Sequence, residues 1–258
     1  MKPRKSLGQN FLTDPNVARK IVGALRAPDG AAVVEIGPGT GALTGLLHER
    51  FPDLTALEVD DRAVALLRDR FPGLDVRHAD VLATDWAALA REKGRPLYVI
   101  GNLPYYITSE ILFGLLDARS HLAEAVVMMQ LEVAQRLVAV PRTKAYGILS
   151  VAVQLAAAPE LLFHVSKNVF YPKPDVTSAV VRLDFSQGDA AASGVDPALL
   201  RQVIRTAFNQ RRKTLRNSLG RWTRDRGLTL PHGWGACRAE ELEPGAFVVL
   251  ARYLQEHA

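Results

Sequence analysis

The sequence predicts an α/β fold in which a doubly wound, mostly parallel seven-stranded sheet is followed by a small C-terminal helical domain. Short apolar runs rich in β-branched residues recur through the first 185 residues, as expected of strands buried on both faces. Helix-like patterns lie between these runs, and such an alternation produces a parallel sheet with helices on both faces. The apolar residues of the last third have helical spacing instead, which predicts a separate helical domain.

Seven strands are expected in chain order. The first five have the parallel pattern and occupy residues 31–37, 54–60, 74–80, 97–100 and 125–130. Two further candidates, residues 161–169 and 178–185, are joined by the proline-rich segment YPKPD. Because a short connection suits antiparallel neighbours, we expect this pair to lie antiparallel at one end of the sheet.

A small, polar segment, SQGDAAASGVDP at residues 186–197, predicts a linker between two domains. Residues 1–185, with an N-terminal arm, then form the larger domain, and residues 198–258 form a small, basic helical domain. Asp196 and Pro197 predict the start of its first helix, with Asp196 as the N-cap and Pro197 at the first helical position.

The net charge of +5 is concentrated in the C-terminal third of the chain. Residues 201–226 contain nine basic residues and a single acidic one, which is typical of a surface that binds a polyanion such as RNA. A solvated helical face is the alternative. The candidate phosphate contacts are Lys5, Arg205, Arg211, Arg212, Lys213 and Arg216. Binding through such residues weakens steeply with added salt.

Composition excludes several other classes of protein. No apolar run approaches the roughly 20 residues that span a bilayer, and no signal-peptide core is present, so we expect a cytoplasmic protein. The single cysteine, Cys237, excludes an intramolecular disulfide and a zinc cluster. The histidines lack metal-ligand spacing, so no metal is expected. Nothing suggests an obligate oligomer, and a monomer is expected.

A glycine-rich turn, EIGPGTG at residues 35–41, follows the first strand and precedes a helix. Gly37 and Gly39 let the backbone come close to a ligand, and open α/β sheets bind ligands at this edge. Glu58 ends the second strand, where a carboxylate can bind two ribose hydroxyls, and Asp80 ends the third, where it can accept from an adenine amino group. The turn differs from the G-x-G-x-x-G of dinucleotide-binding proteins. These features favour S-adenosylmethionine over a nicotinamide cofactor or a turn without a ligand.

The segment Asn102-Leu103-Pro104-Tyr105 ends the fourth strand at the same edge. Asn102 offers an amide oxygen as an acceptor, and either the Leu103 or the Pro104 carbonyl can offer a second. Two acceptors would aim the lone pair of an adenine amino group at a methyl donor and stabilise the charge that develops on its nitrogen. Tyr105 supplies a flat ring on which the base can stack. We therefore predict these four residues as the catalytic group.

The chain resembles the ribosomal RNA adenine dimethylase family, whose members have the Rossmann-like fold of class I methyltransferases. The resemblance rests on GQNFL, EIGPGTG, NLPY, FYPKPDV and FNQRRKTLRN, at residues 8–12, 35–41, 102–105, 170–176 and 208–217. The first four motifs are shared with members that methylate large-subunit rRNA and confer macrolide resistance. The fifth is typical of members that act on the small subunit.

The resemblance implies further site residues. Asn10 and Leu12 match positions that line the cofactor site from the N-terminal arm. The positions that match the main S-adenosylmethionine contacts are Gly37, Glu58, Asp80 and Asn102. Phe170 matches an aromatic residue that packs on the target base opposite Tyr105. One local difference is Arg142, which stands where a small residue is usual in its loop.

The resemblance also implies a function. It predicts an enzyme that transfers methyl groups from S-adenosylmethionine to N6 of adenines in small-subunit rRNA, twice per base, during ribosome biogenesis. Its partner would be small-subunit rRNA or a small-subunit assembly intermediate. The alternatives are a large-subunit methylase of the resistance type, an assembly factor that acts mainly by binding, and a nicotinamide oxidoreductase.

Overall fold

The structure, a computed structural model, describes residues 1–187, 194–224 and 227–257. The chain divides into two units: Met1–Ala134 with Pro159–Ser186, and Gln135–Ala158 with Gln187–Ala258. Residues 188–193 of the predicted linker lie outside the described residues. The division differs from the predicted boundary at residue 185, because Gln135–Ala158 belongs to the second unit. The physical reason is that apolar residues of this segment, such as Val151, lie in the core of that unit.

The first unit is built on a seven-stranded sheet with the order β4-β3-β2-β5-β6-β9-β7. Its strands are β2 (Ala32–Ile36), β3 (Leu54–Glu58), β4 (Asp75–His78), β5 (Leu97–Asn102), β6 (Leu122–Gln130), β7 (Ala158–Val165) and β9 (Ser178–Asp184). Neighbours from β4 to β6 are parallel, and β9 is antiparallel to β6. All residues of β2 and β3 are buried, as the continuous apolar runs predict. The predicted fold class is confirmed.

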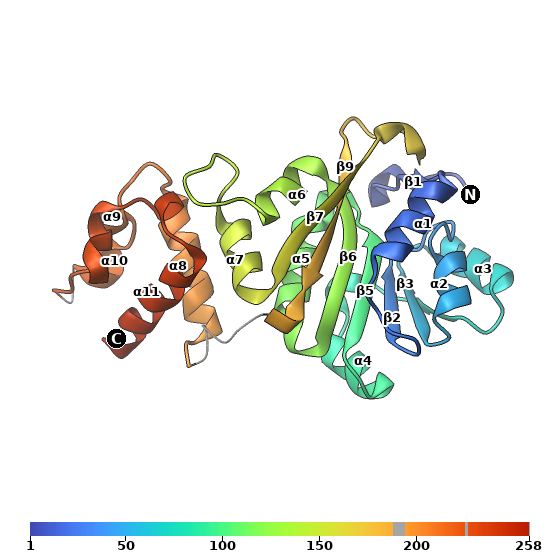
Figure 1. Cartoon of the computed structure of the whole chain (residues 1–258), viewed down its shortest axis with the longest axis horizontal. Coiled ribbons are helices and arrows are strands. Elements are labelled where there is room, and N and C mark those ends of the chain that lie inside the picture. The colour runs from blue at the N-terminus through green and yellow to red at the C-terminus, as the bar shows by residue number, and fades with distance from the viewer. Residues whose placement is uncertain (188–193, 225–226, 258) are drawn as a thin grey trace. The chain divides into compact units, whose positions relative to one another are not determined.

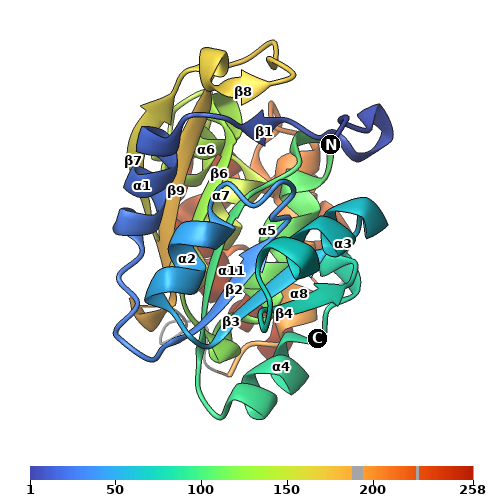
Figure 2. The same ribbon diagram turned by 90° about the vertical axis from the view of Figure 1, so that its right-hand side faces the viewer.

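Helices lie on both sides of this sheet (Figures 1 and 2). They are α1 (Pro15–Ala24), α2 (Thr44–Arg50), α3 (Asp61–Arg70), α4 (Trp86–Lys93), α5 (Thr108–Asp117) and α6 (Leu131–Leu137). Asp14, Asp60 and Asp85 cap α1, α3 and α4 by accepting from backbone N–H groups of the first turn. Buried residues of α1, α2 and α3 share one hydrophobic cluster with Val33 of β2 and Val126 of β6. These three helices therefore cover the same face.

A second, very small sheet fixes the N-terminal arm. Its strand β1 (Phe11–Leu12) pairs antiparallel with β8 (Phe170–Tyr171). Beyond this pair, the Thr13 N–H donates to the Val169 carbonyl at 2.8 Å. Residues far apart in the sequence are thereby held at one place, next to the carboxyl edge of the large sheet (Figure 2).

The second unit is helical. Its helices are α7 (Ile148–Ala156), α8 (Pro197–Asn209), α9 (Leu215–Ser218), α10 (Gly220–Thr223) and α11 (Pro244–Glu256). The predicted start of α8 is confirmed, because Asp196 caps the helix by accepting from the Ala198 N–H at 2.9 Å. Its apolar residues enclose Tyr146, which is fully buried and donates its hydroxyl to the Leu242 carbonyl. None of the helices in the described part of the chain has the length and apolar content of a membrane span.

Candidate active site

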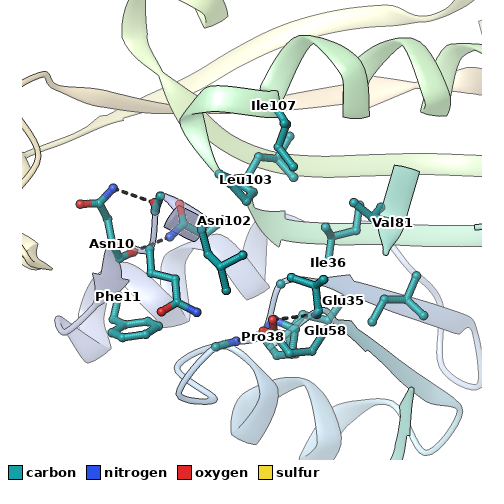
Figure 3. A pocket seen from close by; sticks show the side chains of 18 of the residues that line it. Asn10, Phe11, Glu35, Ile36, Pro38, Glu58, Val81, Asn102, Leu103 and Ile107 are labelled. Atoms are coloured by element: carbon teal, nitrogen blue, oxygen red, sulfur yellow. Dashed lines mark hydrogen bonds between the residues drawn. The ribbon is translucent and has the colours of Figure 1, made fainter. Parts of the chain in front are cut away.

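One pocket of about 300 Å³ lies at the carboxyl ends of β2, β3 and β5 (Figure 3). Residues 7–12 of the N-terminal arm and residues 79–82 after β4 complete its lining. The pocket brings together the predicted residues Asn10, Leu12, Gly37, Gly39, Glu58, Asp80, Asn102, Leu103, Pro104 and Tyr105. Phe170 is not part of the lining.

The glycine turn after β2 has a backbone conformation that side chains disfavour. Gly37 and Gly39 have φ of 62° and 55°, in the left-handed region. The Gly37 N–H donates to the Leu57 carbonyl at 2.9 Å, which fastens the turn to β3. A Cβ on Gly39 would lie 3.0 Å from the ring of Phe11 in the arm. Glycine is therefore required here by conformation and, at Gly39, by close packing.

Glu58 holds this turn and its own strand end together. Its Oε2 accepts from the Gly39 N–H at 2.9 Å, and its Oε1 accepts from the N–H groups of Val59 and Asp60, each at 2.9 Å. The Oε1 atom thus has both lone pairs engaged, whereas Oε2 retains one. This arrangement can accept one ligand hydroxyl on Oε2. The predicted binding of two ribose hydroxyls through both oxygens stays a prediction.

Asn102, at the end of β5, is oriented by the N-terminal arm. Its Nδ2 donates to the Asn10 carbonyl at 2.9 Å, and because a carbonyl can only accept, this contact assigns the direction of the amide (Figure 3). Its Oδ1 is buried and accepts no hydrogen bond from the described residues. An unpaired buried acceptor costs about 1–3 kcal/mol. In a pocket lining, such an atom indicates a donor on the ligand.

The two backbone carbonyls after Asn102 are not equivalent. The Pro104 carbonyl accepts from the Thr108 hydroxyl at 2.9 Å and from the Ile107 N–H at 3.3 Å, so both of its lone pairs are engaged. The Leu103 carbonyl accepts no hydrogen bond within the described part of the chain, while the Leu103 N–H donates to the Met128 carbonyl at 2.9 Å. Of the two carbonyls that the sequence leaves open, that of Leu103 is available.

Three aromatic residues near the pocket have different exposures. Tyr105 is half-buried, and its hydroxyl shares a 2.6 Å hydrogen bond with Ser178 of β9, while burial raises the pKa of the phenol. Phe170 is only 5% exposed and packs in the core behind β8, so its ring is not presented to the pocket here. Tyr106, which the sequence favours as a structural rather than a catalytic residue, lines the pocket and is 56% exposed.

Polar contacts hold the rest of the rim. Asp80 is exposed, and its Oδ1 caps the short helix Val81–Ala83 by accepting from the Leu82 N–H at 2.9 Å, which leaves Oδ2 for a ligand. Gln9 of the arm donates to Asp60 Oδ2 at 2.9 Å. Hydrogen bonds from Arg62, above all, hold the pKa of Asp60 well below its usual range. Asp60 therefore stays ionised and anchors the arm beside the pocket.

Glu35 is a pocket residue whose role the sequence did not predict beyond its place in the glycine motif. Its side chain is fully buried and lines the pocket, and its Oε2 has no hydrogen-bond partner in the described residues. Burial raises the pKa of Glu35 to about 8; the Thr44 hydroxyl, which makes no hydrogen bond of good geometry, opposes the rise, and the Glu58 carboxylate adds to it. Glu35 is therefore mainly uncharged at neutral pH.

The predicted phosphate contacts of the second unit divide into two groups. Arg205, Arg212, Lys213 and Arg216 have exposed side chains. The Arg211 guanidinium instead contacts Glu240 and donates to the carbonyls of Thr143 and Lys144 at 3.1 and 2.9 Å. Lys5 begins a short helix, Lys5–Leu7, in the arm.

A doubly wound sheet with a glycine turn, an acidic residue at the next strand end and an Asn-Leu-Pro-Tyr segment in one pocket defines a Rossmann-like methyltransferase. The sequence model of one protein family, ribosomal RNA adenine dimethylase, matches residues 1–255. The chain belongs to this family, and the predicted resemblance is confirmed.

Relatives and solved structures agree with this assignment. Proteins named ribosomal RNA small subunit methyltransferase A are similar to the chain. That of Salinibacter ruber is 59% identical over 257 residues, which cover 100% of this chain and 86% of the relative. That of Leptothrix cholodnii is 45% identical over 259 residues, which cover 98% of this chain and 93% of the relative. A crystal structure of a dimethyladenosine transferase from Plasmodium falciparum is similar to this chain, with a TM-score of 0.78 and 22% sequence identity. The match covers 96% of this chain and 98% of the chain in the crystal structure. At this identity the likeness supports the fold alone. The crystal structure of the 23S rRNA methyltransferase ErmE has a TM-score of 0.69 and 25% sequence identity, and the match covers 95% of this chain and 100% of the ErmE chain.

Proposed function

We propose that this enzyme transfers methyl groups from S-adenosylmethionine to N6 of adenines in small-subunit rRNA, twice per base, to give N6,N6-dimethyladenosine. The observation that carries the proposal is the buried, unpaired Oδ1 of Asn102, which lies in the pocket and requires a donor such as an amino group. The names of the similar proteins from Salinibacter ruber and Leptothrix cholodnii support the small subunit as the source of the RNA.

The residues of the pocket fit S-adenosylmethionine. The turn at Gly37 leaves the space of a side chain beside the strand ends, because a Cβ there would meet only the Asn102 carbonyl oxygen, at 4.0 Å. Free lone pairs on Glu58 Oε2 and Asp80 Oδ2 suit the hydroxyl and amino donors of an adenosine group. When bound, the cofactor supplies a methyl group activated by the positive charge of its sulfonium.

The chain's contribution to the transfer is to orient the target amino group. An adenine amino nitrogen is a poor nucleophile because its lone pair is delocalised into the ring. The Asn102 Oδ1 and the Leu103 carbonyl are the two acceptors that can each take one of its N–H bonds. They hold the nitrogen lone pair out of conjugation with the ring, and their attraction grows as positive charge develops on the nitrogen. No general base is needed before transfer, since the methylated ammonium is strongly acidic.

Stacking compensates for removing the target base from the RNA. Tyr105 is fixed through Ser178 and offers its ring at the pocket, where stacking contributes about 1–3 kcal/mol per base. A second stacking role for Phe170 requires that its buried ring become exposed when RNA binds. Tyr106 already lines the pocket with an exposed ring.

The test is methyl transfer to isolated ribosomal subunits. We expect labelled methyl groups from S-adenosylmethionine to appear as N6,N6-dimethyladenosine in small-subunit rRNA taken from cells that lack this modification. Label only in large-subunit rRNA would favour the resistance-type activity instead. Glu58→Ala should abolish transfer while binding to the subunit persists. If Glu58→Ala fully restored the growth of cells that lack this protein while their rRNA stayed unmethylated, an assembly factor that acts mainly by binding would be favoured.

A further inference from the structure

The loop between α6 and α7, residues 140–145, presents basic side chains from a strained backbone. Arg142 has φ of 67°, a left-handed conformation that disfavours an arginine. Its side chain is nevertheless 75% exposed, and Lys144 is exposed two residues later. Contacts with the rest of the unit must therefore hold the loop in this conformation.

Contacts from the C-terminal part of the same unit hold this loop. The Arg142 N–H donates to the Glu240 carbonyl at 2.7 Å. The Arg211 guanidinium donates to the carbonyls of Thr143 and Lys144 and pairs with the Glu240 carboxylate. An arginine fork that makes three contacts of this kind fixes the backbone geometry, which a lysine with its single point charge cannot do.

These contacts also decide which charges remain for a partner. Arg211 neutralises Glu240, and its own donors point to the loop. Among the described residues the Arg142 guanidinium pairs with the Glu241 carboxylate at 3.9 Å, near the outer limit of an ion pair, and an exposed pair at that distance is weak. Because Arg211 contacts the loop directly, the exposed Arg212 and Lys213 that follow it in the chain lie next to the same loop. The loop and this turn together form a cationic surface.

We propose that residues 140–145 form an RNA-contacting loop in which Arg142 binds a backbone phosphate and Arg211 acts as a positioning residue. The inference rests on the proposed function, because it takes the partner to be ribosomal RNA, and it deepens that function by adding a contact outside the pocket and outside the FNQRRKTLRN motif. It also reverses the expectation from the sequence, which places Arg211 but not Arg142 among the candidate phosphate contacts.

The test is equilibrium binding of the full chain to small ribosomal subunits lacking dimethyladenosine, titrated with KCl at fixed Mg²⁺. Arg142→Asn removes the charge but keeps a residue that tolerates the left-handed conformation. We expect it to weaken binding several-fold and to lower the slope of log affinity against log salt by about one. Arg142→Lys should restore the slope. Arg91→Gln on α4 removes one exposed arginine elsewhere and should change neither quantity.

Arg211→Lys tests the positioning role, because it keeps the charge and removes the fork. By itself it should weaken binding about as much as Arg142→Asn. Arg211→Gln removes the charge as well, and combined with Arg142→Asn it should add no further loss of salt slope, since both changes remove the same phosphate contact. A second unit of slope lost in this double variant would mean that Arg211 binds phosphate itself, which contradicts the inference.

Two further outcomes separate this inference from the proposed function. An Arg142→Asn protein with wild-type affinity overturns the phosphate contact, and so does one with lowered affinity but an unchanged salt slope, which points to a ribosomal protein at this loop. Neither result affects methyl transfer at the pocket. A wild-type protein that binds only large subunits contradicts the small-subunit function, while a slope lowered by Arg142→Asn in that complex still supports the loop contact.

Discussion

At the residue scale, Glu35 is the group whose charge depends most on burial. With a pKa raised from 4.5 to about 8, it keeps its proton in the folded chain while the unfolded chain loses it. The contribution of Glu35 to the free energy of unfolding therefore falls as pH rises from about 4.5 to 8, and it stays constant above pH 8. Glu35→Gln removes this dependence. The free energy of unfolding of the variant minus that of wild type should therefore be larger at pH 8 than at pH 5, by up to about 4 kcal/mol.

Urea unfolding of both proteins at the two pH values measures this difference. Glu49→Gln, at an exposed position on α2, controls for the loss of one carboxyl group. An equal stability difference between Glu35→Gln and wild type at pH 5 and pH 8 would show that Glu35 is already ionised in the folded chain.

The residues at strand ends are those that the sequence could place in space most directly. Glu58, Asp80 and Asn102 could be placed at one edge because parallel strands all end there. The choice of Leu103 over Pro104 could not be predicted, since it depends on the Thr108 hydroxyl that occupies the Pro104 carbonyl. The burial of Phe170 likewise depends on a distant partner, the N-terminal arm.

At the scale of elements, the close pairing of β5 with β2 fixes the position of Asn102. Gly101 precedes it, and a Cβ on Gly101 would lie 2.6 Å from the Ile36 carbonyl oxygen. Gly101→Ala should therefore destabilise the protein by about 1–3 kcal/mol, because the backbone must shift to remove the clash. The same shift moves Asn102, so methyl transfer should fall as well.

A matched control is available in α5. A Cβ on Gly114 would meet nothing within 4 Å, and the residue lies inside a helix. Gly114→Ala should stabilise the protein by about 0.5–1 kcal/mol. Urea unfolding of the two variants checks both signs, and a Gly101→Ala protein as stable as Gly114→Ala would contradict the packing described.

The elements of the sheet were predictable because strands buried on both faces are continuous apolar runs. The five predicted parallel strands and the added pair all occur, with ends shifted by a few residues. The β1–β8 pair was not predicted, because two-residue strands have no periodicity to detect. That pair positions Asn10, whose carbonyl orients Asn102. Part of the site geometry was therefore invisible to a reading of local patterns.

At the scale of the whole molecule, Gln135–Ala158 interrupts the first unit in sequence but takes part in the core of the second. Tyr146 is buried among C-terminal residues such as Phe208 and Phe247. A chain ending at residue 186 should expose this apolar surface, and so bind a hydrophobic dye and aggregate, whereas the full chain should not. A truncated protein that stays monomeric without dye binding would contradict the division.

The predicted boundary at residue 185 followed composition, which changes there, whereas the observed division follows packing. The apolar residues of α7 give no sign in the sequence of which core they join. The concentration of basic residues in 201–226 was visible from composition alone. The internal use of Arg211 was not, because its partners Thr143, Lys144 and Glu240 lie elsewhere in the chain.

The central claim is that Asn102 Oδ1 orients the adenine amino group, and single-turnover methyl transfer by Asn102→Ala tests it most directly. With S-adenosylmethionine and small subunits both saturating, the rate constant should fall about 100–1,000-fold, because one preorganised partner of the developing charge is lost. The dissociation constant of the cofactor, measured by calorimetry, should change far less. A rate constant within a few-fold of wild type would contradict the account.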